Sequence, residues 1–189
     1  MPDKLLVILD LDETLIHATD TPYDDQWHFE VFGYKVYRRP HLTEFIDGLR
    51  DRFHVAVWSS ASDDYVEKVV AEIFPSGYPL EFVWGRSRCT RKPDYEKAEQ
   101  MGFFDPSHYD YIKKLEKVFE KFPFRKERVV IVDDTPRKAM YNFGNAICPC
   151  EFTGGADDDE LKHLLEYLCR LEHVENVRSV EKRNWKEFR

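Results

Sequence analysis

The most constraining feature of this sequence is an apolar run, residues 5–9, that ends abruptly in Asp10 and is followed by Asp12. A continuous apolar run of this length is typical of a strand that is buried on both faces, as in a parallel sheet. Carboxylates directly after such a strand stand where open α/β sheets bind their ligands. The run therefore predicts a parallel α/β sheet with a charged site at the carboxyl end of this strand.

Strand and helix patterns alternate along most of the chain. Apolar runs predict strands at 54–58, 81–84, 129–132 and near 146–148. Helical spacing of apolar residues predicts helices after Pro40, after Ser62, from Ile112 to Phe122, and from about residue 157. This alternation predicts a Rossmann-like α/β fold with a parallel sheet and helices on both faces.

Two segments depart from this alternation. Residues 19–38 hold alternating aromatic and β-branched residues, which predict a small β-hairpin flap turning near Gly33. Residues 86–109 are polar, contain two prolines, and predict a long loop over the site. With these insertions we expect one domain over residues 1–175, and the mixed-charge residues 176–189 are expected to form a solvated tail.

Composition limits the possible partners. The formal net charge of −8 and the pI near 5.4 argue against a broad nucleic-acid-binding face, although Arg86 and Arg88 belong to a local basic cluster that is either a groove wall or a solvated loop. No segment approaches the roughly 20 apolar residues of a membrane helix, so no membrane partner is expected. The N-terminus lacks a signal-peptide pattern, and we expect a soluble intracellular protein, cytoplasmic or, in a eukaryote, nuclear.

Four carboxylates are expected to converge where two central strands end: Asp10, Asp12, Asp133 and Asp134. Unit charges about 4 Å apart repel by roughly 1 kcal/mol per pair in water and by more in a partly buried site. A cation is therefore required, and Mg²⁺ suits a shell of carboxylate, carbonyl and water oxygens. The sequence predicts Mg²⁺ as the cofactor.

Four motifs occur in order: DLDETLIH from Asp10, VAVWSSAS ending a strand in Ser59, HYDYIKKL with Lys113, and VVIVDDTP with Asp133 and Asp134. Together they resemble the haloacid dehalogenase superfamily of phosphatases. The DLDETLIH form is similar to one branch of it, the RNA polymerase II C-terminal-domain phosphatases and their NLI-interacting-factor-like relatives.

The resemblance implies roles for these residues. Asp10 would be the nucleophile that forms an aspartyl-phosphate, and Asp12 would be the acid and base, with its backbone carbonyl on the metal. Thr14 would fix the loop and orient Asp12. Ser59 and Lys113, with Lys114 as the neighbouring alternative, would hold phosphate oxygens. Asp134 is the first choice for the metal ligand of the fourth motif, with Asp133 beside it.

The resemblance also bears on the substrate, because many superfamily members carry a cap domain that closes over small metabolites. The intervals in this chain leave no room for a full cap domain, and an open site favours a phosphate displayed on a macromolecule. Trp27, Arg39, Arg86 and Arg88 are the expected substrate contacts. The hairpin aromatics Trp27, Phe29 and Tyr37 are candidates for groove walls, and half of them are expected to pack on the core instead, since strand side chains alternate between faces.

Several functions remain open. The leading hypothesis is a phosphatase acting on phosphoserine or phosphothreonine of a protein. A phosphatase of DNA or RNA ends is second, and a small-metabolite phosphatase is third. The non-enzyme alternative is an inactive phosphopeptide-binding module, which would not need Asp12. The natural substrate, the organism and the oligomeric state are left open.

Overall fold

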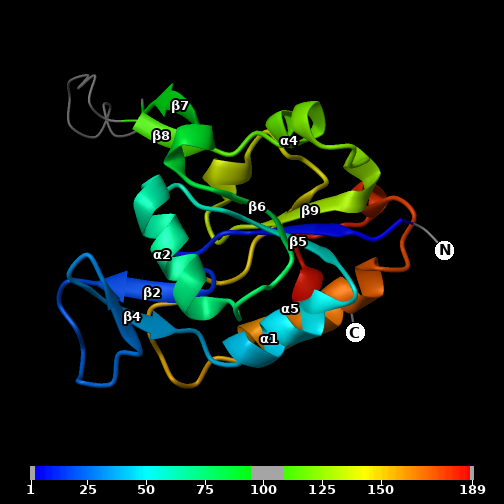
Figure 1. The fold of residues 1–189 in the computed structure, drawn as a ribbon. Coiled ribbons are helices and arrows are strands. Elements are labelled where there is room, and N and C mark those ends of the chain that lie inside the picture. Colours follow the sequence, from blue (N-terminus) through cyan, green and yellow to red (C-terminus); the bar gives the residue numbers. More distant parts are fainter. Residues whose placement is uncertain (1–2, 95–108, 188–189) are drawn as a thin grey trace.

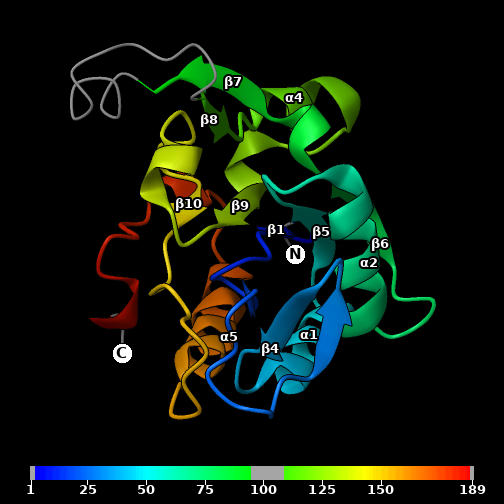
Figure 2. The same cartoon turned by 90° about the vertical axis from the view of Figure 1, so that its left-hand side faces the viewer.

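Five parallel strands form the centre of the computed structural model, which describes residues 3–94 and 109–187. Their order is β10-β9-β1-β5-β6, seen end-on in Figure 2. The strands are β1 (Leu6–Leu9), β5 (His54–Trp58), β6 (Leu80–Trp84), β9 (Val129–Val132) and β10 (Ala146–Ile147). Every residue of β1 is buried, because β1 is central and both faces of the sheet are covered. The predicted parallel sheet is confirmed.

Helices cover both faces of this sheet (Figure 1). α1 (Leu42–Arg50), α2 (Asp63–Ile73) and α5 (Glu160–Leu171) lie on one face, and α4 (Glu116–Lys121) lies on the other. Successive residues of β1 point to opposite faces, so Val7 joins the core under the first group and Ile8 joins the core under α4. None of the helices within the described residues is long and apolar enough to cross a membrane.

A second, antiparallel sheet contains the predicted hairpin. β3 (Phe29–Val31) and β4 (Tyr34–Arg38) pair around a turn at Phe32 and Gly33, both of which have positive φ angles, 49° and 87°. Positive φ at both central residues matches the right-handed twist of the strands and favours glycine at the second position. β2 (Ile16–Thr19) adds a third strand on the other side of β4, and it continues directly from the loop that carries Asp12.

The prediction of a loop over residues 86–109 is wrong at both ends of that segment. The single turn η1 (Arg86–Arg88) is followed by β7 (Thr90–Pro93), which pairs with β8 (Tyr109–Ile112) in an antiparallel hairpin. The middle of the predicted loop, residues 95–108, lies outside the described residues. The helix predicted from Ile112 begins only at Glu116, because Ile112 is the last residue of β8.

The chain end is also more ordered than predicted. Trp185, in the turn η5 (Trp185–Glu187), is 4% exposed, packs on Tyr167 of α5, and donates from Nε1 to the Cys148 carbonyl at 3.1 Å. A tryptophan buries a large apolar area, which outweighs the charges around it in the sequence. The remaining short turns are η2 (Lys126–Arg128), η3 (Pro136–Ala139) and η4 (Val177–Ser179).

Arg39 is buried, which contradicts its predicted role as a substrate contact. Its side chain is fully enclosed and forms two bonds, of 3.0 and 2.9 Å, to the Asp158 carboxylate before α5. It also donates to the carbonyl oxygens of Thr14 and Cys150 at 2.9 and 2.8 Å. Arg39 therefore joins the loop after β1 to the start of α5, and its hydrogen bonds are used inside the protein.

Arg39→Met should lower the free energy of unfolding by about 2–4 kcal/mol, because two carbonyls and one carboxylate lose their donor. Arg183→Met, at an exposed position, is the control and should change stability by no more than about 0.5 kcal/mol. Burial alone would raise the pKa of Asp158, but its hydrogen bonds with Arg39 lower it below the ordinary value of an aspartate. The stabilisation is thus fully present above the pKa that Asp158 has in the unfolded chain, and it is lost as the pH falls through the folded-state pKa. Urea unfolding that gives equal stability for wild type and Arg39→Met at neutral pH would contradict this account.

Candidate active site

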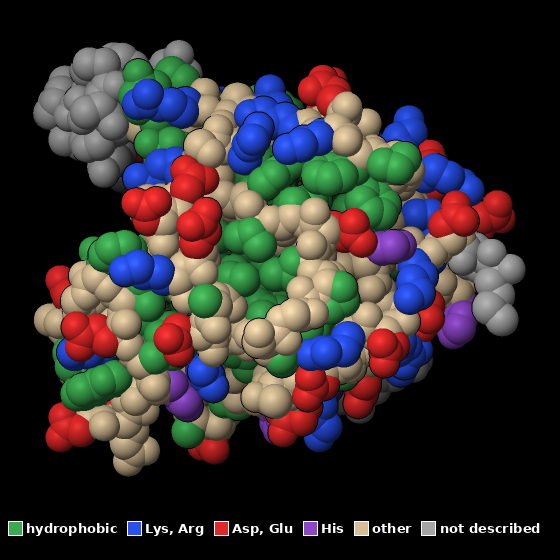
Figure 3. Space-filling view, viewed as in Figure 1, with side chains coloured by type: hydrophobic (Ala, Val, Ile, Leu, Met, Phe, Trp, Pro, Cys, Tyr) green, Lys and Arg blue, Asp and Glu red, His purple; other side chains and the backbone are tan. Residues whose placement is uncertain are grey.

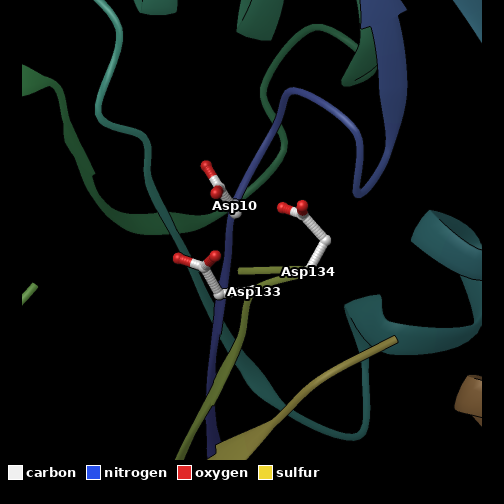
Figure 4. A group of neighbouring side chains, drawn as sticks. All are labelled: Asp10, Asp133 and Asp134. Carbon is white, nitrogen blue, oxygen red and sulfur yellow. The ribbon is translucent and has the colours of Figure 1, made fainter. Parts of the chain in front are cut away.

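Asp10, Asp133 and Lys113 form a buried ion cluster at the carboxyl edge of the sheet. β1 and β9 are neighbours in register, so the residues that follow them, Asp10 and Asp133, lie side by side (Figure 4). Lys113 follows β8, and its Nζ lies 2.8 Å from Asp10 Oδ2 and 2.6 Å from Asp133 Oδ2. All three side chains are at most 1% exposed. The structure thus brings together residues from three predicted motifs.

The environment shifts the pKa values of the two carboxyl groups in this cluster in opposite directions. Burial alone would raise the pKa of Asp10, but the charges of Lys113 and Lys138 outweigh it, so the pKa is lowered. Burial, and then the charge of Asp10, raise the pKa of Asp133 to about 7. Burial would lower the pKa of Lys113, but Asp10 and Asp133 raise it. Asp10 is therefore held as a carboxylate beside a protonated lysine.

Asp12 lies beside this cluster and is oriented by two hydroxyl groups. Tyr65 Oη donates to Asp12 Oδ1 at 2.7 Å, and Ser59 Oγ donates weakly to Oδ2 at 3.4 Å. Ser59 Oγ also accepts from the Ala61 amide at 3.0 Å, which fixes the loop between β5 and α2. Burial, supported by the charge of Asp10, raises the pKa of Asp12 against the hydrogen bond from Tyr65. Tyr65 was not predicted, since it resembles any residue of the buried face of α2.

Thr14 has a different partner from the one that the resemblance implies. Its Oγ1 donates to Asp134 Oδ1 at 3.3 Å and accepts from the Asp134 amide at 3.2 Å. Asp134 Oδ2 also accepts from Thr135 Oγ1 at 3.0 Å. Thr14 therefore ties the loop after β1 to the loop after β9, while the hydrogen bonds to the Asp12 carboxylate come from Tyr65 and Ser59.

Three carboxylates are close enough to hold one cation. Asp10, Asp133 and Asp134 each offer an oxygen, and these oxygens lie within 4.8 Å of one another (Figure 4). Two of the three residues are buried, so part of the cost of enclosing their charges would be offset by a divalent ion. Hard oxygen donors of this kind suit Mg²⁺. Asp12 was also predicted as a metal ligand, through its backbone carbonyl, and its side chain does not belong to this group of three carboxylates.

An open pocket of about 520 Å³ has Asp12 in its lining. Its walls come from the turn of the β3–β4 hairpin, the start of α2, and Arg86. The lining residues are Asp12, Glu13, Ala18, Phe32, Tyr34, Ala61, Ser62, Asp64, Tyr65 and Arg86. Figure 3 shows the molecule hollowed on its left side between the β2–β4–β3 sheet and the β7–β8 hairpin, with acidic side chains beside the hollow.

Only one of the predicted substrate contacts, Arg86, lines this pocket. Arg88 turns away, with its guanidinium 5.7 Å from the Trp84 ring centroid. Trp27 lies outside the pocket, 4.9 Å from the Lys35 ammonium.

Phe29 and Tyr37 were also predicted as groove walls. Phe29 packs against the core, and Tyr37 is 5% exposed. The wall consists instead of Phe32 and Tyr34, because the hairpin turn presents them outward.

Residues 5–178 match the family of NLI interacting factor-like phosphatases. The chain belongs to this family. The match covers all four motifs, and it confirms the resemblance predicted from them. The names of the family and of its relatives indicate a phosphatase.

Several curated relatives of this NLI interacting factor-like protein are similar along most of the chain. The human carboxy-terminal domain RNA polymerase II polypeptide A small phosphatase 1 is 27% identical over 94% of this chain and 63% of that protein. The CTD small phosphatase-like protein 2 of Dictyostelium discoideum is 28% identical over 93% of this chain and 29% of its own. Nuclear envelope morphology protein 1 of Saccharomyces cerevisiae is 24% identical over 94% and 41%. The chain thus spans less than two thirds of each of these relatives.

Solved structures agree with the fold. The structure of Fcp1, an essential RNA polymerase II CTD phosphatase, superposes with a TM-score of 0.57 at 19% identity and covers 93% of this chain and 51% of its own. A haloacid dehalogenase-like hydrolase from Xanthomonas campestris gives a TM-score of 0.55 at 10% identity, with 91% and 97% coverage. At these identities the likeness concerns the fold alone.

Proposed function

We propose that this chain hydrolyses phosphate monoesters through an aspartyl-phosphate on Asp10. The observation that carries the proposal is the Asp10 carboxylate held 2.8 Å from the Lys113 ammonium, with the Asp12 carboxylate beside it at an open pocket. An oxygen of Asp10 would attack phosphorus while the bond to the leaving oxygen breaks. Lys113, bound to both Asp10 and Asp133, would hold a phosphoryl oxygen as negative charge gathers there.

Asp12 would move the protons of both steps. Its carboxyl would first give a proton to the leaving oxygen. The resulting carboxylate would then take a proton from the water that attacks phosphorus, which releases inorganic phosphate and restores Asp10. The hydrogen bonds from Tyr65 and Ser59 support this role, because they fix the orientation of the carboxyl toward the pocket.

Asp10, Asp133 and Asp134, with the Asp12 carbonyl, would hold a divalent ion, with Mg²⁺ as the best match to the oxygen donors. When bound, the ion would neutralise charge on the phosphoryl group. Thr14 and Thr135 would keep the Asp134 carboxylate in place through their hydrogen bonds.

Removal of divalent ions should abolish turnover of an aryl phosphate, because the carboxylate cluster would repel a phosphate dianion. The measurement is steady-state turnover in excess chelator, before and after Mg²⁺ is added back. Ca²⁺ serves as a comparison, since its larger coordination shell fits the site less well. Full activity in excess chelator would contradict the metal assignment.

For the substrate we propose phosphoserine or phosphothreonine of a protein. The pocket is open, and its aromatic wall at Phe32 and Tyr34 could accept apolar side chains of a peptide next to the phosphorylated residue. The names of the relatives, which describe CTD phosphatases, agree with a phosphoprotein as the substrate. Among the residues that line the pocket, Arg86 is the one lysine or arginine, so the pocket offers few contacts to the successive phosphates of a nucleic acid strand.

A turnover panel tests this choice of substrate. It compares phosphopeptides, 5′- and 3′-phosphorylated oligonucleotides and sugar phosphates at equal concentrations. The phosphopeptides should have the highest kcat/KM. A higher kcat/KM for an oligonucleotide, with the steep loss on added salt that counterion release causes, would favour a nucleic-acid end instead.

A further inference from the structure

Lys138 is a second cation at the Asp10 carboxylate, and the sequence motifs did not point to it. It lies in the turn η3 after the fourth motif, and its Nζ is 3.5 Å from Asp10 Oδ2. Its side chain is 25% exposed, whereas that of Lys113 is completely buried. Lys138 therefore stands between the buried cluster and the solvent.

The backbone around Lys138 is fixed by the surrounding elements. Its amide donates to the Thr135 carbonyl at 3.0 Å, and its own carbonyl accepts from the Lys113 amide at 2.8 Å. The neighbouring Arg137 forms ion pairs with Asp94, after β7, and with Asp110 of β8, at 2.9 and 2.6 Å. The β7–β8 hairpin thus holds η3 in place, so the Lys138 side chain extends from a rigid base.

The two lysines differ in what they can still bind. The Lys113 ammonium already contacts Asp10 and Asp133 at 2.8 and 2.6 Å. The contact of Lys138 with Asp10 is looser, and an ammonium group has three N–H donors. The Lys138 ammonium can therefore be reached from the solvent and can donate hydrogen bonds to an arriving anion.

We propose that Lys138 binds a non-bridging oxygen of the substrate phosphoryl group, beside Lys113. This inference rests on the proposed function. The four carboxylates Asp10, Asp12, Asp133 and Asp134 would otherwise face a phosphate dianion with one lysine and one metal ion. A second ammonium group reduces the net negative charge that the dianion meets.

The positive charge of Lys138 should weaken the binding of Mg²⁺, although it strengthens the binding of phosphate. Asp10 belongs to the carboxylate group that could hold Mg²⁺, and a cation 3.5 Å from its Oδ2 repels a second cation. Removing the charge of Lys138 should therefore weaken phosphate binding and strengthen Mg²⁺ binding. A residue that only stabilises the fold would not produce these two opposite shifts.

The test uses Lys138→Met and Lys138→Arg, with Lys121→Met as the matched control. Lys121→Met also removes one positive charge, but Lys121 is the exposed last residue of α4, and its ammonium lies 5.7 Å from the centroid of the Trp84 ring. The measurements are Mg²⁺ affinity by calorimetry without substrate, the inhibition constant of inorganic phosphate, and KM and kcat for an aryl phosphate.

Lys138→Met should raise the phosphate inhibition constant and KM by about tenfold to hundredfold, as expected for one charge-assisted contact. It should tighten Mg²⁺ binding by about threefold or more. Lys138→Arg should recover most of both values, and Lys121→Met should match the wild type. If the wild type is active but Lys138→Met has an unchanged inhibition constant for phosphate, the inference is wrong. It is also wrong if Lys138→Met binds Mg²⁺ more weakly than the wild type does. A wild type without any phosphatase activity would instead refute the proposed function.

Discussion

Asp10→Asn is expected to lose all measurable turnover, a decrease of at least about 10³-fold, because an amide cannot attack phosphorus. The variant should still fold. Lys113 keeps its ion pair with Asp133 at 2.6 Å, and the amide oxygen can still accept the 2.8 Å hydrogen bond from the Leu11 amide. Steady-state assays with an aryl phosphate at saturating Mg²⁺ measure the effect.

Asp20→Asn is the matched control, since Asp20 is exposed beyond the end of β2. It removes the same charge from the chain and should retain wild-type turnover. Thermal melts of both variants separate lost chemistry from lost folding. Asp10→Asn with activity near that of Asp20→Asn would show that another residue attacks phosphorus.

Asp12→Asn is expected to reduce turnover by about 10²- to 10⁴-fold, the usual contribution of a positioned acid or base. The amide can still accept the hydrogen bond from Tyr65, so the loop should keep its shape. In the phosphoryl-transfer step the loss should be largest for a peptide phosphate, whose alkoxide leaving group needs a proton. An activated aryl phosphate needs little protonation and should still transfer its phosphoryl group to Asp10.

Single-turnover release of the leaving alcohol, from the aryl phosphate and from the peptide phosphate, checks this prediction for Asp12, because steady-state kcat also includes hydrolysis of the phosphoenzyme, in which Asp12 would act again. Equal losses on the two substrates in this first step would show that Asp12 acts on binding or on the metal rather than on the leaving group.

The central architecture follows from the sequence because β1, β5 and β9 are short, mainly apolar runs, each followed directly by a polar residue. The ends of β1, β5 and β9 accordingly place Asp10, Ser59 and Asp133 at one edge of the predicted sheet. Lys113 could be placed near them only through the resemblance. Its position after a strand was missed, because Ile112 also fits the apolar spacing of the helix that follows.

Most of the residues that line the pocket could not be predicted from the sequence, since the lining depends on which way each side chain faces. Neighbouring residues of a strand point to opposite sides, so an aromatic hairpin does not reveal which rings meet the pocket. Arg39 and Arg86 illustrate the same difficulty: one is enclosed by Asp158, and the other lines the pocket. Lys138 was missed because its proximity to Asp10 depends on the path of η3.

The central claim, that Asp10 is the nucleophile, is tested most directly by locating the phosphoryl group in Asp12→Asn. The variant is mixed with an aryl phosphate in a single turnover and quenched in acid at successive times, and its peptides are analysed by mass spectrometry while phosphate release is followed. A phosphoryl group on Asp10 is expected to accumulate as the aryl alcohol is released and then to decay slowly. A phosphoryl group on any other residue, or phosphate released with no phosphoenzyme at any time, would contradict this claim.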